Sequence, residues 1–221
     1  MENLIRFFAA ACLTCLLTLT GFTQGGTTGS LTWSLSVGGD TLTIYGSGTM
    51  ADYTPATSPW YPYESSITTV IIGDSVKNIG NCAFSGGNYT YAHYRNLTSV
   101  SIGDSVASIG NGAFWGSGLT SITIPNSVIT IDVYAFYECK SLTTLNIGSG
   151  ITSIGGFAFS DCMSMSYINI TAVVPPVTAA GAFFWVPLDA SVNVPCGSET
   201  AYRDTTGQST WGANGMGWCR F

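Results

Sequence analysis

The chain has 221 residues, of which 8% are charged, and its formal net charge is −6 with an isoelectric point near 4.4. Its 25 serines and 28 threonines outnumber the 18 charged residues, while apolar residues make up a normal 46%. This composition excludes a basic surface for nucleic acid, a long charged helix and a disordered chain. A single histidine and few carboxylates also argue against an enzyme.

Residues 1–23 have the layout of a secretory signal peptide. Arg6 precedes an apolar run from Phe7 to Leu19, and small and polar residues follow it. The run is shorter than the roughly 20 residues that span a bilayer, and Cys12 and Cys15 are poorly placed for lipid attachment. We therefore expect cleavage near Thr23 and an extracellular or cell-surface protein, with the periplasm as an open alternative. A buried N-terminal helix is the structural alternative.

Residues 24–66 precede the repeats and are expected to form an N-terminal cap. The stretch from Leu31 to Tyr45 alternates polar and apolar residues around Gly38-Gly39, a pattern that predicts a β-hairpin. A hairpin at this place can cover the apolar core of the first coil of a repeat array.

The central part of the chain repeats one sequence pattern. Four full units read L-T-S, then an alternating run, then S-V-x-x-I, and end in A-F before a short turn, whereas the fifth unit breaks at Pro175-Pro176. Successive units are 30, 22, 23 and 23 residues apart. Their first residues are Ile67, Leu97, Leu119, Leu142 and Met165.

The two short alternating runs in each unit predict two short strands, and no unit holds a helical pattern of ten residues. One unit cannot close a core by itself, so the units are expected to stack into a solenoid in which each coil contacts only its neighbours. Six apolar positions of one coil should then face the same positions of the next. These are Leu97, Val100, Ile102, Val106, Ile109 and Phe114 against Leu119, Ile122, Ile124, Val128, Ile131 and Phe136.

The repeat resembles the BspA-like leucine-rich repeats of bacterial surface proteins, whose 23-residue units end in the same A-F pair. The resemblance covers about five repeats over 67–175, and it implies a β-rich leucine-rich-repeat solenoid with short strands and short 3-10 or helical turns. A β-hairpin N-cap is expected before these repeats, and an irregular C-terminal cap is expected over 176–221. The family also implies adhesion, or binding to an extracellular protein or glycan. A structural or assembly component of the cell envelope, without an external ligand, is the alternative function.

Five cysteines follow the predicted signal peptide: Cys82, Cys139, Cys162, Cys196 and Cys219. Their odd number leaves at least one thiol unpaired within the chain. For Cys196 and Cys219 the sequence leaves two possibilities open. They form a disulfide with each other, or each is a separately buried thiol. Cys139 and Cys162 occupy the same repeat position, so we expect them in a buried ladder of turns rather than in a disulfide.

Two groups of residues are candidates for binding a partner. Outward-facing positions of the first strand in each unit should form a face of hydroxyl and amide groups, although the same residues would also simply solvate the coils. An insertion in the first repeat carries tyrosine and arginine, which are common at interfaces, although such a loop can also pack its own tyrosines. The candidates on the strands are Ser99, Ser101, Ser121, Thr123, Thr144, Asn146, Tyr167 and Asn169, and those in the insertion are Tyr89, Tyr91, His93, Tyr94 and Arg95.

Catalytic and cofactor motifs are missing from the sequence. There is one imidazole, no nucleophile elbow, no phosphate-binding loop and no spacing typical of a metal site. We therefore predict a binding protein with no catalysis, no cofactor and no metal. The oligomeric state and the identity of the ligand are left open.

Overall fold

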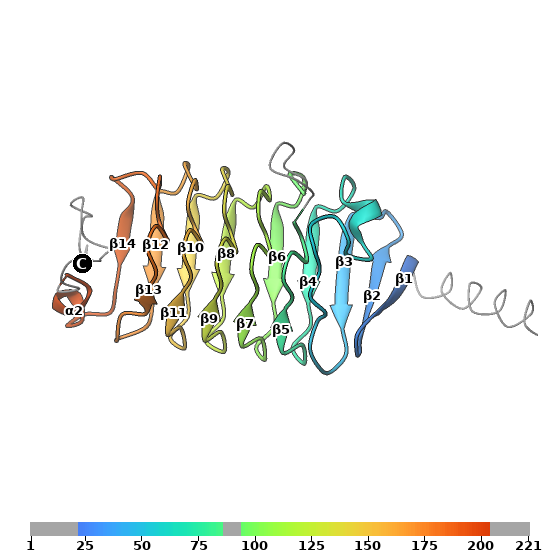
Figure 1. Ribbon diagram of the computed structural model, residues 1–221, viewed down its shortest axis with the longest axis horizontal. Coiled ribbons are helices and arrows are strands. Elements are labelled where there is room, and N and C mark those ends of the chain that lie inside the picture. The colour runs from blue at the N-terminus through green and yellow to red at the C-terminus, as the bar shows by residue number, and fades with distance from the viewer. Residues whose placement is uncertain (1–21, 86–93, 204–221) are drawn as a thin grey trace, which may run out of the picture.

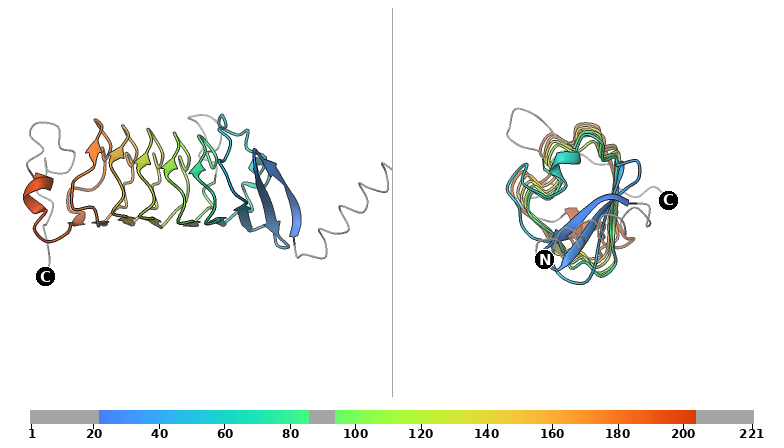
Figure 2. Two further views of the ribbon diagram at one scale, coloured as in Figure 1. Left: turned by 90° about the horizontal axis from the view of Figure 1, so that it is seen from below. Right: turned by 90° about the vertical axis from the view of Figure 1, so that its right-hand side faces the viewer.

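The computed structural model describes residues 22–85 and 94–203, and this part of the chain is a β-solenoid (Figure 1). The coils follow one another along the long axis, and in the end-on view of Figure 2 they superpose on one outline. Each complete coil carries one strand of four residues and one of two residues. The predicted fold class is therefore confirmed.

The long strands pair in parallel with the same residue positions opposite each other, and the short strands do the same. The long strands are β4 (Thr69–Ile72), β6 (Ser99–Ile102), β8 (Ser121–Ile124), β10 (Thr144–Ile147) and β12 (Tyr167–Ile170), followed by β14 (Ser191–Asn193). The short strands are β5 (Asn78–Ile79), β7 (Ser108–Ile109), β9 (Thr130–Ile131), β11 (Ser153–Ile154) and β13 (Val177–Thr178).

An antiparallel meander precedes the coils. It consists of β1 (Phe22–Thr28), β2 (Leu31–Ser36) and β3 (Thr41–Tyr45), with Gly38 and Gly39 in the turn between the last two. The β3 strand then pairs in parallel with β4, so the meander continues into the first coil. A 3-10 turn, η1 (Tyr61–Tyr63), lies between β3 and β4, and a short helix, α2 (Glu199–Arg203), lies after the last strand.

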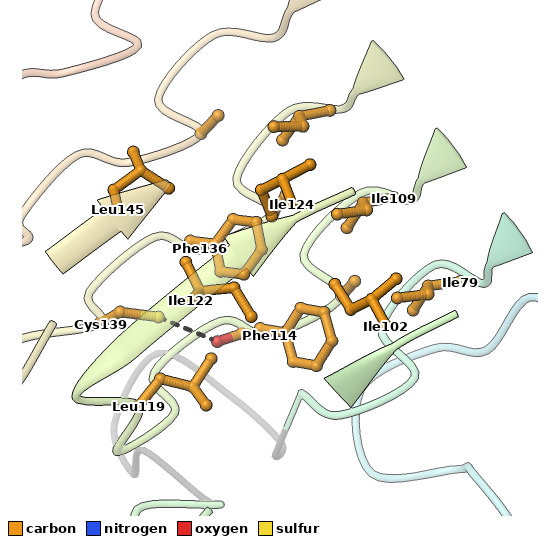
Figure 3. Packing of buried hydrophobic residues seen from close by; sticks show 14 of the residues in the cluster. Ile79, Ile102, Ile109, Phe114, Leu119, Ile122, Ile124, Phe136, Cys139 and Leu145 are labelled. Carbon is orange, nitrogen blue, oxygen red and sulfur yellow. Dashed lines mark hydrogen bonds between the residues drawn. The ribbon is translucent and has the colours of Figure 1, made fainter. Parts of the chain in front are cut away.

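A column of stacked phenylalanine rings runs through the core. Each ring comes from the A-F pair of one coil, and neighbouring centroids are 5.1–5.2 Å apart with planes within 13° of parallel. The indole of Trp60 stacks on the first ring at 5.5 Å and donates its N–H to the carbonyl of Ala83. Figure 3 shows two of these rings among the isoleucines and leucines of adjacent coils. The column consists of Phe84, Phe114, Phe136, Phe159 and Phe183.

The twelve core positions predicted from the repeat all face the interior. Eleven are buried, and Val100 is partly buried against the same cluster. The alternating pattern therefore identified the inward positions of each strand correctly. The apolar face of each coil is closed only by its neighbours, as expected for a solenoid.

As far as the structure describes them, the turns around the A-F pairs use two backbone positions in the left-handed region. One lies two residues before the phenylalanine and the other two residues after it. Glycine adopts this conformation freely, whereas other residues lose about 1–2 kcal/mol there. The first position holds Cys82, Gly112, Tyr134, Phe157 and Gly181, and the second holds Gly116, Glu138, Asp161 and Trp185.

The row of long strands is interrupted between β6 and β8, a break that we call the seam. One sheet contains β1 to β4 and β6, another contains β8, β10, β12 and β14, and the short strands form one continuous sheet. Gly148 donates its N–H to the carbonyl of Ile124, 2.9 Å away. Pro125 occupies the equivalent place one coil earlier and has no N–H to offer Ile102. The turn before β8 is also one residue shorter than the turn before β10.

Candidate functional site

The outward side chains of β8, β10, β12 and β14 form two straight rows, which together we call the polar face. Because the strands pair in register, each side chain lies beside its counterpart on the next coil. One row consists of Ser121, Thr144, Tyr167 and Ser191, and the other of Thr123, Asn146, Asn169 and Asn193. None of these side chains carries a charge.

Hydrogen bonds join two neighbouring pairs of side chains in the second row. The amide of Asn193 donates to Oδ1 of Asn169 at 2.6 Å, and the amide of Asn146 lies 3.5 Å from the hydroxyl of Thr123. These contacts orient the amides, while Ser121, Thr123 and Tyr167 remain exposed. The arrangement presents fixed donors and acceptors at a regular spacing without a strong electrostatic field.

Ser99 and Ser101 lie on β6, on the other side of the seam, and pair with β4 rather than with β8. Both are exposed. The structure therefore brings six of the eight strand candidates into one hydrogen-bonded sheet and leaves these two on the neighbouring sheet.

Sequence analysis missed Ser191 and Asn193, which extend the polar face by one strand. They lie in the region assigned to the C-terminal cap, and β14 pairs with β12 in parallel and in the same register as one coil pairs with the next. The signal was the alternation of Val192 and Val194 with polar residues, and both valines are buried. The break at Pro175-Pro176 concealed it.

The structure corrects the interpretation of Tyr94. Its side chain is 1% exposed and packs edge-on against Phe84, and its hydroxyl lies 3.4 Å from that of Ser58. Its backbone N–H donates to Oε2 of Glu64 at 3.1 Å, and burial raises the pKa of the phenol. Tyr94 is thus a core residue that a partner cannot reach.

The remaining insertion candidates divide into two groups. Arg95 is exposed, directly after Tyr94. Tyr89, Tyr91 and His93 lie outside the described residues.

A second ladder lies in the turns behind the phenylalanine column. Cys139 and Cys162 are fully buried, and each thiol donates to a phenylalanine carbonyl of the preceding coil, at 3.3 and 3.4 Å. The hydroxyl of Ser117 lies at the same position and is 3.2 Å from the sulfur of Cys139. Both cysteines are free thiols, so the expected ladder is present. The proposed partner of Cys196, Cys219, lies outside the described residues.

The thiols should differ sharply in reactivity. Burial raises the pKa of Cys139 to about 12 and that of Cys162 well above its usual value, so both stay protonated and covered at neutral pH. Cys196 is exposed. We expect iodoacetamide at pH 8 to alkylate Cys196 in the native protein, and Cys139 and Cys162 only in denaturant. Peptide mass spectrometry measures this, and rapid native labelling of either buried thiol would contradict it.

The described residues offer no group of three or more His, Cys, Asp or Glu side chains that could hold a metal ion. Over 22–85 and 94–203, no helix has the length and hydropathy needed to cross a membrane. The polar face consists of hydroxyl and amide side chains, which act through hydrogen bonds and surface contact.

Comparison with known proteins identifies relatives that share this repeat and this fold. The model of the BspA-type leucine-rich repeat region matches residues 60–178 with six copies, against the five or so repeats expected from the sequence. A leucine-rich repeat protein from Eubacterium ventriosum is 26% identical with a TM-score of 0.59, and the match covers 78% of this chain and 43% of that one. The pneumococcal vaccine antigen PcpA is 16% identical with a TM-score of 0.52, covering 80% and 51%. The chain thus spans about half of these structures, and no curated protein matches it.

Proposed function

The chain belongs to the BspA-type leucine-rich repeat family, and from this premise we propose that it is an exported recognition protein that binds an extracellular protein or glycan. The family and fold are typical of binding scaffolds rather than of enzymes. The apolar run near the N-terminus supports export to the cell surface or the medium.

The observation that carries the proposal is the register of the polar face. Parallel coils repeat the same outward positions at every step, so uncharged donors and acceptors form rows several strands long. Such a surface gains specificity because a ligand must place its own donors and acceptors opposite these groups. A ligand that leaves a buried donor or acceptor without a hydrogen bond binds less well. Protein loops and glycan hydroxyls both offer matching groups.

A binding screen with surface variants tests this function. Binding of the protein lacking residues 1–23 to a panel of matrix proteins and glycans is measured first. The same measurement is then made on the Thr123→Arg and Thr144→Arg variants. Each arginine places a long charged side chain on the polar face, so we expect binding to weaken at least tenfold. Thr152→Arg, at an exposed position beside the short strands, is the matched control and should bind like the parent.

Circular dichroism and thermal melting must first show that all three variants fold. Equal binding by the polar-face variants and the parent would refute the assignment of the site. No saturable binding to any panel member, together with co-purification with cell-envelope material, would favour the envelope role instead.

A further inference from the structure

Aromatic rings line the turns that follow the short strands, away from the polar face. Trp115 and Tyr134 stack at 6.0 Å, and Tyr134 and Phe157 stack at 5.5 Å. Tyr137 meets the first two edge-on, at 5.4 Å from each. We call these four residues the aromatic strip. All are half-buried or exposed, and Phe157 is 39% exposed.

The backbone of the coils does not need these rings. Tyr134 and Phe157 occupy the first left-handed position of their turns, where the neighbouring coils have Gly112 and Gly181 with the same sign of φ. Repeats of one chain act as controls for each other, and the glycine coils show that the turn forms without a side chain. Two large apolar rings therefore stand at positions where the local conformation favours glycine.

Gly181 makes room for a ring of the strip, whereas Gly112 lies at ordinary contact distance from another. A Cβ atom on Gly181 would lie 2.7 Å from Cε1 of Phe157, so this ring rests directly on the glycine backbone. A Cβ atom on Gly112 would lie 3.8 Å from Cε3 of Trp115, which continues the row at that end. The strip is thus a continuous line of rings over three coils.

Carboxylates accompany the rings. Glu138 and Asp161 occupy the second left-handed position of the same turns, where Gly116 stands one coil earlier. Both carboxylates raise the pKa of Tyr137 through their charge, which places them near its hydroxyl, although burial is the larger cause. Lys140 forms an ion pair with Glu138 at 3.5 Å, so the charge beside the rings is mixed near Glu138 and acidic near Asp161, and both carboxylates are half-buried.

Rings beside carboxylates are the combination that recognises organic cations. A guanidinium stacks on aromatic groups and pairs with carboxylates, and its planar shape suits both contacts. We propose that the aromatic strip is a second binding site, separate from the polar face, for an extended segment of a partner protein that bears arginine side chains. The segment lies along the solenoid axis, so that successive cations meet successive coils.

Synthetic peptides test the site directly. Fluorescent glycine-serine peptides with arginine at every second residue are titrated into the protein lacking residues 1–23, beside versions with lysine, citrulline or glutamate. We expect saturable binding of the arginine peptide, several-fold weaker binding of the lysine peptide, and none of the other two. Raising the salt from 50 to 500 mM should weaken binding, since screening reduces the attraction of the carboxylates.

Variants that take their residues from the neighbouring coils show whether the arginine peptide binds at the aromatic strip. Tyr134→Gly with Phe157→Gly reproduces the residues at 112 and 181, so folding should be retained while affinity for the arginine peptide falls at least tenfold. Glu138→Gln with Asp161→Asn keeps the rings and should also weaken binding at least fivefold. Asp104→Asn, an exposed carboxylate on another turn, controls for general attraction by the net charge. Tyr167→Ser, which copies Ser121, controls for loss of an aromatic residue on the polar face.

The proposal is overturned if the citrulline peptide binds equally well, or if the charge variants and Asp104→Asn behave alike. It is also overturned if glycans bind the strip and arginine peptides do not. If the glycine variants fail to fold, the Glu138 and Asp161 variants still show whether the arginine peptide binds at the strip. Loss of binding at the polar face alone would leave this result unchanged, so the two sites can fail independently.

Discussion

Replacing Phe136 with alanine should lower the free energy of unfolding by about 3–5 kcal/mol. The ring is fully buried and stacks on both neighbours, at 5.2 Å from Phe114 and 5.1 Å from Phe159. Its removal leaves a cavity that the coils on either side cannot fill, because they are held in place by their own hydrogen-bond ladders. The loss exceeds that of a typical point mutation, whose cost is near 1 kcal/mol.

Urea denaturation followed by circular dichroism measures the effect. Phe136→Leu, which keeps most of the volume but loses the stacking, should cost about 1.5 kcal/mol or less. Ser141→Ala, at an exposed position on the same coil, should change stability by less than about 0.5 kcal/mol. A cost below about 1 kcal/mol for the alanine variant would mean that the phenylalanine column does not hold the coils together.

Alkaline pH is expected to destabilise the protein steeply. The thiols of Cys139 and Cys162 have ordinary pKa values near 9 in the unfolded chain, but burial raises the pKa of Cys139 to about 12 and also raises that of Cys162. Below pH 9 both states keep these protons, so the thiols contribute no pH dependence. Above it the unfolded chain loses protons that the folded chain retains, and each thiol lowers stability by about 1.4 kcal/mol per pH unit.

Denaturation at pH 8, 9, 10 and 11 checks this slope. The double variant Cys139→Ser and Cys162→Ser copies Ser117 of the preceding coil and should lose much less stability between pH 9 and pH 11 than the parent. A residual decline is expected above pH 10, because burial raises the pKa of Tyr202 to about 12. Parallel pH profiles for the parent and the double variant would show that the thiols are not the cause.

The sequence predicted the coils because every coil reuses one template, so that alternation assigned the inward and outward positions directly. The core positions and the rows of the polar face followed from this register. Tyr94 was misassigned because the insertion has no counterpart in other coils, and only tertiary packing shows that its ring contacts Phe84.

The aromatic strip was missed for a related reason. Trp115 and Tyr134 stand at different positions of the repeat, three residues apart in their turns, and their rings meet across the boundary between two coils. A repeat alignment compares like positions and therefore does not show such diagonal contacts. The left-handed backbone at Tyr134 and Phe157 was also hidden, because non-glycine residues rarely adopt it.

The seam gives the solenoid a preferred place to bend. On one side of the coil, β6 and β8 have no ladder between them, whereas the short strands and the phenylalanine column cross the same boundary without interruption. Separating β6 from β8 therefore breaks no strand ladder, while the short strands on the opposite side stay paired. A ligand that contacts both sheets would bridge this gap and hold β6 and β8 at a fixed separation.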